Sequence, residues 1–170
     1  MTTQAPTHRR APAPQVAASV VDPELPMLTL AELGVLRGVD VEGDRVEVLI
    51  TPTYSGCPAL ATMRDDLVRV LQEAGYPDVE VRVQLQPAWS SDDITPSGRA
   101  RLAEAGISPP GPADRGGPVA LNLLPTRRTL SCPRCGAAEV ELTSEFGATA
   151  CKALYRCTAC LEPFEHVKEI

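Results

Sequence analysis

The chain has 170 residues, a length typical of one domain or of one domain plus a small module. It carries 16 Lys and Arg against 22 Asp and Glu, and its net charge of −6 argues against a dominant nucleic-acid-binding role and against electrostatic docking on a membrane. No apolar run is long enough to span a bilayer, and residues 1–14 lack the apolar stretch of a signal peptide, so we expect a cytoplasmic protein. The acidic side chains concentrate in residues 22–104, which suits a protein partner with a basic patch.

The N-terminal part of the chain predicts a short helix followed by a hairpin. Residues 1–14 are polar and rich in proline, and we interpret them as a disordered arm. Residues 15–21 predict a short helix, which Pro23 stops because the residue before a proline disfavours the helical conformation. Alternating apolar side chains in residues 35–41 and 45–50, joined by a turn that contains glycine, predict a β-hairpin.

The strongest helix signal lies in residues 58–74. Pro58 suits a first helical turn, and Gly75 suits the position after the last turn. This boundary puts Cys57 at or beside the N-cap of the helix. The apolar stripe of this helix consists of Leu60, Met63, Leu67, Val68 and Leu71.

Further elements complete an α+β domain. Residues 79–85 alternate between apolar and polar side chains, which predicts a half-buried strand, and residues 95–106 predict a short helix. The order helix, strand, strand, helix, strand, helix predicts an α+β fold in which a small, mostly antiparallel sheet packs with helices. We place this domain at residues 15–106, a Pro- and Gly-rich linker at 107–131 and a second small module at 132–170.

The second module contains two C-x-x-C pairs, a spacing typical of a tetrahedral zinc site with four thiolate ligands. The segments between the pairs alternate enough to be strands, so the module is predicted to be a zinc ribbon whose structural metal supplies much of the folding free energy. Disulfides or free thiols are the alternatives, and four thiolates also suit iron. The predicted ligands are Cys132, Cys135, Cys157 and Cys160.

Two further cysteines need an explanation. A four-cysteine site does not use Cys151. One interpretation is that Cys151 is a small buried side chain or a bystander, and the other is that it is an extra reactive thiol or an alternative metal ligand. Cys57 is expected to be a reactive thiolate, because helix-end amides lower the pKa of a nearby thiol. A Cys–His enzyme is disfavoured, since the only histidines are His8 in the arm and His166, which we expect on the ribbon surface.

A lone thiolate without a supporting base suits transient metal transfer better than catalytic turnover. A single cysteine cannot hold a cluster, so transfer would need the partner's own ligands or a homodimer that joins two copies of Cys57. Asp22 and Glu24 are candidate metal ligands. The alternative interpretation is that Asp22-Pro23-Glu24 is a helix stop with a capping carboxylate.

Several segments resemble known families over about residues 15–170. Three of them are similar to the iron–sulfur assembly domain of the SufT type, namely Asp22-Pro23-Glu24-Leu25-Pro26, Glu32-Leu33-Gly34 and Thr51-Pro52-Thr53-Tyr54-Ser55-Gly56-Cys57-Pro58. A narrower set resembles the PaaD family, whose members are encoded with the other components of phenylacetyl-CoA epoxidase. This set consists of Pro87-Ala88-Trp89, Gly106-Ile107-Ser108-Pro109-Pro110, Cys151-Lys152-Ala153-Leu154-Tyr155-Arg156-Cys157 and Glu162-Pro163-Phe164.

The resemblance implies an accessory role in aerobic phenylacetate breakdown rather than catalysis. The epoxidase has a di-iron oxygenase core and a reductase with flavin and a plant-type [2Fe–2S] cluster, and the PaaD protein is expected to assist their maturation or repair. Cys57 would handle iron or an iron–sulfur cluster transiently, with Asp22 and Thr53 at neighbouring motif positions. The implied partners are the epoxidase subunits, especially the iron–sulfur flavin reductase. A non-catalytic structural subunit is the alternative.

Overall fold

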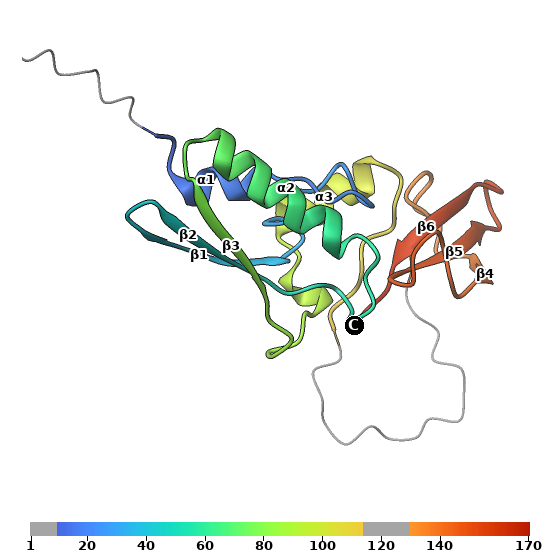
Figure 1. Ribbon diagram of the computed structural model, residues 1–170. Helices are drawn as coiled ribbons and strands as arrows, with labels where there is room; N and C mark the ends of the chain where they lie inside the picture. The colour runs from blue at the N-terminus through green and yellow to red at the C-terminus, as the bar shows by residue number, and fades with distance from the viewer. Residues whose placement is uncertain (1–9, 114–129) are drawn as a thin grey trace, which may run out of the picture.

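The computed structural model describes residues 10–113, here called the first unit, and residues 130–170, here called the ribbon (Figure 1). The elements are α1 (Ala13–Ala18), β1 (Leu36–Glu42), β2 (Arg45–Ile50), α2 (Leu60–Glu73), β3 (Asp78–Val83), a 3-10 turn (Ser91–Asp93), α3 (Pro96–Glu104), β4 (Val140–Ser144), β5 (Lys152–Cys157) and β6 (Pro163–Val167). The strands form two three-stranded sheets, β1-β2-β3 and β4-β5-β6, so the predicted α+β class is confirmed. None of the helices in these two ranges has the length and apolar character needed to cross a membrane.

The first sheet contains one parallel strand pair, which the sequence analysis did not predict. β1 and β2 pair antiparallel through the tight turn between them, whereas β2 and β3 pair in parallel. The parallel pair forms because α2 lies between β2 and β3 in the chain, and a helical crossover returns the chain to the same end of the sheet. The ribbon pairs β4–β5 and β5–β6 are both antiparallel, so the sheets are mostly antiparallel taken together.

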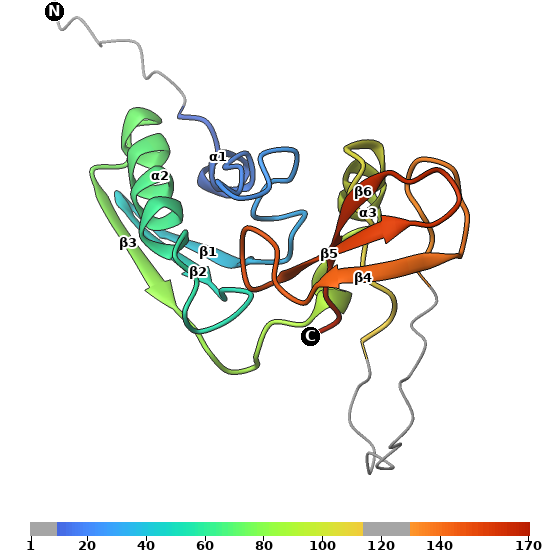
Figure 2. The ribbon, with the colours of Figure 1, turned by 90° about the vertical axis from the view of Figure 1, so that its right-hand side faces the viewer.

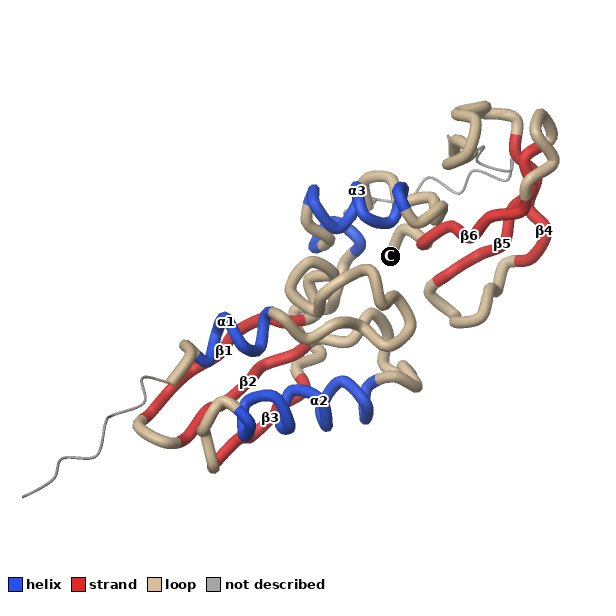
Figure 3. The backbone as a smooth tube through the Cα atoms, turned by 90° about the horizontal axis from the view of Figure 1, so that it is seen from above, coloured by secondary structure: helices blue, strands red, loops and turns tan. Residues whose placement is uncertain are grey.

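Helices α1 and α2 cover one face of the first sheet (Figures 2 and 3). Val46, Val48 and Ile50 of β2 point to this face and are fully buried, as the alternating pattern predicts. The other face carries ion pairs, such as that of Arg45 with Glu80 at 2.6 Å. The helix side of this core is formed by Ala13, Ala17, Met63, Leu67 and Leu71.

The N-terminal helix begins earlier than the sequence pattern indicates. α1 starts at Ala13, inside the segment predicted as a disordered arm, and Pro14 suits its first turn. The Arg10 guanidinium pairs with the Asp44 carboxylate at 2.5 Å, and the Tyr76 hydroxyl donates to the Ala11 carbonyl at 3.0 Å. Residues 10–14 are therefore ordered, and the rest of the predicted arm lies outside the described residues.

The ribbon docks on the first unit through β6, a strand that the sequence analysis missed. Ser108 forms a parallel bridge with His166, the Ser108 amide donates to the Glu165 carbonyl at 2.8 Å, and the Val167 amide donates to the Ser108 carbonyl at 3.0 Å. Val167 is part of the main hydrophobic core. The first residues of the predicted linker, 107–113, thus pack against the ribbon, while residues 114–129 lie outside the described part.

His166 corrects a prediction. We expected it on the ribbon surface, but its side chain is 0% exposed. Its Nδ1 atom lies 3.1 Å from the Ser108 carbonyl oxygen, and its Nε2 atom lies 3.4 Å from the Glu169 carboxylate. The prediction is wrong because β6 turns this face of the ribbon toward the first unit, and no local pattern reveals that pairing.

Candidate metal-handling pocket and cysteine cluster

A small pocket of about 20 Å³ lies where the ribbon meets the first unit. This volume accommodates about one water molecule or one ion. Leu25 and Leu33 contribute apolar walls. The polar lining consists of Asp22, Glu24, Thr53, Tyr54, Cys57, Thr149 and Cys151. The pocket therefore brings together the three predicted cluster-handling residues of the first unit and the surplus thiol of the ribbon.

Asp22 is held in place by the turn that follows it. Its Oδ1 atom accepts hydrogen bonds from the amides of Glu24 and Leu25, both at 2.8 Å, and the residue is only 5% exposed. Burial raises the pKa of this carboxyl, although the two amide bonds oppose the rise. Asp22 thus caps a turn rather than a helix, since α1 ends at Ala18, and it lines the pocket as well.

Cys57 lies in the loop that leads from β2 to α2. Its amide donates to the Tyr54 carbonyl at 3.2 Å, and its carbonyl accepts from the Leu60 amide at 3.3 Å. The N-cap of α2 is Ala59, so Cys57 lies in the loop before the cap rather than forming it. The side chain is half-buried and packs against the main core.

The pKa of Cys57 is raised, which contradicts the expectation of a stabilised thiolate. Burial is the largest cause, and the negative charge of Asp22 and the neighbouring Cys151 add to it. The Ala59 amide lowers the pKa as helix-end reasoning predicts, but it is outweighed. The expectation is wrong because the carboxylate and the second thiol come from other parts of the chain.

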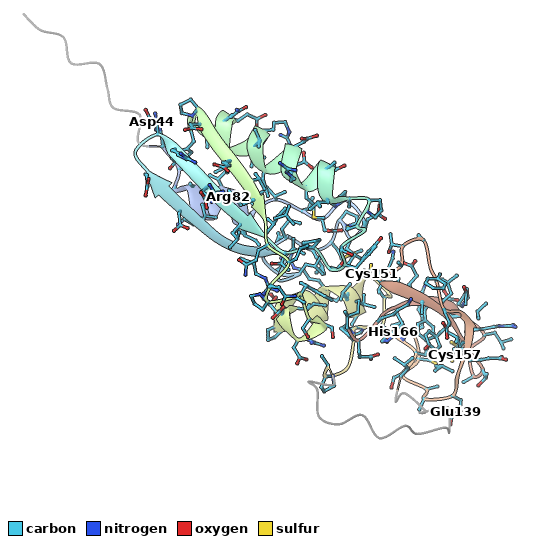
Figure 4. The ribbon with its side chains drawn as sticks, turned by 60° about the horizontal axis from the view of Figure 1, so that its bottom comes forward. Asp44, Arg82, Glu139, Cys151, Cys157 and His166 are labelled. Atoms are coloured by element: carbon cyan, nitrogen blue, oxygen red, sulfur yellow. The ribbon has the colours of Figure 1, made fainter. Side chains whose placement is uncertain are left out.

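Cys151 comes from the loop before β5. Figure 4 shows it at the end of the ribbon that faces the first unit, away from Cys157. The Thr149 hydroxyl lies 3.1 Å from the Cys151 sulfur. The pKa of the Tyr54 hydroxyl is raised, mainly by burial and then by the nearby Cys57 and Cys151. Cys151 is therefore a neighbour of Cys57 in this pocket. The sequence does not predict Tyr54 and Thr149 as pocket residues, since nothing in their local sequence marks them.

The four other cysteines gather at the opposite end of the ribbon, and their ligand atoms all lie within 4.8 Å of one another. The sulfurs of Cys132 and Cys160 are 3.7 Å apart, and those of Cys135 and Cys157 are 3.6 Å apart. A regular tetrahedron with Zn–S bonds of about 2.3 Å has edges of about 3.8 Å. The donor set and its spacing therefore fit Zn²⁺.

Both C-x-x-C pairs have the same local geometry. The residue after each pair has a positive φ, 74° at Gly136 and 64° at Leu161, which turns the backbone around the sulfurs. The Cys160 amide lies 3.4 Å from the Cys157 sulfur and, with the Ala159 amide, lowers the pKa of Cys157 to about 7. The buried hydrophobic cluster here contains only Cys132, Cys157 and Phe164, too small a core to hold the ribbon alone.

Comparison with known proteins agrees with both parts of this arrangement. Residues 17–84 match the family described as "Iron-sulfur cluster assembly protein", and residues 117–168 match that described as "PaaD zinc beta ribbon domain". A protein of Escherichia coli (strain K12), named as the D subunit of "Putative 1,2-phenylacetyl-CoA epoxidase", is 44% identical over 151 residues, which cover 89% of this chain and 87% of the relative. The crystal structure of the domain of unknown function DUF59 from Bacillus anthracis has 25% sequence identity and a TM-score of 0.49, and the match covers 53% of this chain and 87% of that one. The chain therefore belongs to the PaaD family, in which an iron–sulfur assembly domain is combined with a zinc ribbon.

Proposed function

We propose that the protein is an accessory maturation factor in aerobic phenylacetate degradation. It assists the assembly or repair of iron or iron–sulfur centres in the phenylacetyl-CoA epoxidase complex and does not catalyse the epoxidation itself. The assembly-type domain in residues 17–84 and the relative named as an epoxidase subunit support this role.

The pocket that gathers Asp22, Thr53 and Cys57 is the observation that carries the proposal. Hydrolytic cysteine chemistry needs a general base beside the thiol. No histidine is among the described residues that line this pocket, and His166 is bound to Ser108 at the junction. A thiol beside a buried carboxylate, in a pocket whose described lining has no histidine, suits binding and release of a metal ion or cluster.

The proposal assigns a task to each part of the chain. Residues 15–106 handle iron or the cluster, residues 107–131 connect the two modules, and residues 132–170 hold a structural zinc through Cys132, Cys135, Cys157 and Cys160. The partners are the epoxidase subunits, the iron–sulfur flavin reductase above all, in the reducing cytoplasm. A homodimer that joins two copies of Cys57 is one arrangement that would serve transfer.

A second candidate function is a non-catalytic structural subunit of the epoxidase. The name of the E. coli relative, which calls it a subunit, favours this alternative. The two functions differ in what the other subunits lack when the protein is absent. An assembly factor leaves them without metal, whereas a structural subunit leaves them loaded but unassembled.

The test is the metal content of the partners. The reductase and the oxygenase are purified from cells with the wild-type protein, without it, and with Cys57→Ser, and their iron and acid-labile sulfide are measured. We expect both to fall without the protein and with Cys57→Ser. Ser55→Ala, an exposed change in the same loop, is the matched control and should leave both values unchanged. Fully loaded partners that co-purify with equimolar amounts of the protein would instead support the structural subunit.

A further inference from the structure

We propose that Cys57 and Cys151 together form a two-thiol site that holds one thiophilic divalent cation, with the Asp22 carboxylate as an additional ligand. The inference rests on the proposed function and specifies its cargo as a single metal ion, Fe²⁺ in the assembly role. It also gives the ribbon a second task, which is to present Cys151 to the thiol of the first unit. The site would be complete within one chain, without a second copy of Cys57.

The geometry places all three groups around one pocket. Asp22 comes from the turn after α1, Cys57 from the loop before α2, and Cys151 from the loop before β5. The Asp22 Oδ1 atom accepts the amide hydrogen bonds of Glu24 and Leu25, and Oδ2 is the carboxylate oxygen that the proposed site would use as a ligand. Soft thiolate ligands select transition-metal ions rather than magnesium or calcium.

The charges around the pocket favour a cation. Asp22 and Glu24 bring negative charge to the lining, and Lys152, whose charge acts on Asp22, is engaged with the Glu165 carboxylate at 2.8 Å. Without a metal, burial first and then the charges of its neighbours raise the pKa of Cys57, which disfavours its thiolate form. A divalent ion removes this penalty, because M²⁺ and two thiols give a dithiolate complex and release two protons to solvent.

The volume of the pocket and the spacing of its ligands distinguish it from the ribbon site. The pocket volume of about 20 Å³ suits one ion. The four ribbon cysteines have ligand atoms within 4.8 Å of one another. Among the described residues, the three pocket ligands do not form such a group, so they lie farther apart than the ribbon cysteines. A site that must release its ion is expected to be less completely formed than a structural one.

Cobalt binding to the full chain tests the site directly. The reduced, zinc-loaded protein is titrated anaerobically with Co²⁺, and the thiolate-to-cobalt charge-transfer absorption is recorded. Zinc and cobalt are counted by elemental analysis. Four proteins are compared, namely the wild type, Cys57→Ser, Cys151→Ser and Ala150→Ser, the last being an exposed neighbouring change that serves as the matched control.

We expect the wild type and Ala150→Ser to bind one Co²⁺ per chain while keeping the ribbon zinc. Each Cys→Ser change should lower the charge-transfer intensity by about half and weaken binding by about tenfold or more. In the wild type, bound Co²⁺ should also protect both Cys57 and Cys151 from alkylation, a readout by mass spectrometry that needs no variant. Wild-type cobalt binding by Cys151→Ser, or one Co²⁺ shared by two chains, would overturn the proposal.

The metal content of the partners separates this inference from the proposed function. If Cys57→Ser fails to support the reductase cluster while Cys151→Ser supports it fully, the assembly role stands and the two-thiol site is wrong. If both variants support full loading, both proposals are wrong. If both fail while each remains folded, the two-thiol site is supported as the working form of the pocket.

Discussion

Ser108 and His166 pair across the junction between the two parts of the molecule, and this pairing places Cys151 beside Cys57. The bridge is flanked by two backbone hydrogen bonds, which join Ser108 to Glu165 and to Val167. Lys168 then donates its amide to the Cys151 carbonyl at 2.9 Å, which links the loop of the thiol to the docked strand. The position of the pocket thus depends on how β6 is seated.

His166→Ala should loosen this junction. The fully buried imidazole contacts Ser108 and Glu169, so its removal leaves a cavity and lost polar contacts that cost about 2–4 kcal/mol of unfolding free energy. Chemical denaturation measures the loss, and Thr143→Ala on an exposed position of β4 is the control. Cys57 should be alkylated faster in His166→Ala, because the ribbon shields it less. An unchanged alkylation rate would show that the junction does not position the pocket.

Removal of zinc should unfold the ribbon and spare the first unit. The hydrophobic cluster around the ribbon cysteines has three buried residues among those described, so we expect the metal to supply much of the ribbon's folding free energy. We expect about one zinc per native chain. Cys132→Ser, or treatment with a strong chelator, should abolish ordered signals from residues 132–170 in an NMR spectrum while those of α2 persist. A ribbon that stays folded without metal would contradict the assignment of the four cysteines.

Local signals account for what the sequence could predict. The period-2 pattern of Val46, Val48 and Ile50 and the spacing of the four ribbon cysteines each reside in a few consecutive residues, so the strands and the cluster were predicted. The location of Cys151 depends on the pairing of Ser108 with His166, which no local pattern encodes. The same limit explains the wrong pKa direction at Cys57. The helix-end amide is a local feature, whereas burial and the charge of Asp22 are set by tertiary structure.

Gly34 should tolerate no side chain. Its φ is +74°, and a Cβ atom there would lie 2.5 Å from the Asp93 carbonyl oxygen. Gly34→Ala is therefore expected to cost about 3 kcal/mol, from the left-handed backbone together with the clash. Gly43→Ala is the matched control, since its φ is +64° but its Cβ meets nothing within 4 Å, and it should cost only about 1 kcal/mol. Denaturation of the two variants compares them, and equal losses would mean that the Asp93 contact is unimportant.

Cys57 should react slowly at neutral pH. Its pKa is raised by burial and then by Asp22 and Cys151, so the thiolate fraction at pH 7 is smaller than for an ordinary thiol. The alkylation rate of metal-free protein, followed against pH, should have its midpoint above the ordinary value of about 8.5. Asp22→Asn removes one negative neighbour and should move the midpoint down, though not fully, because burial persists. A wild-type midpoint below about 8.5 would reverse this interpretation of the pocket.

Cys57→Ala should abolish support of epoxidase activity and leave the fold intact. The half-buried side chain does not cap α2, whose N-cap is Ala59, so the stability loss should be on the order of 1 kcal/mol or less. The functional loss should be large if sulfur must bind iron, because neither a methyl group nor a serine hydroxyl replaces a soft thiolate. Cys57→Ser is the sharper test, since it preserves the size of the side chain. Phenylacetate-dependent growth and epoxidase turnover, measured beside the thermal stability of each variant, check both expectations. Wild-type turnover in both variants would remove Cys57 from the working site and favour the structural-subunit alternative.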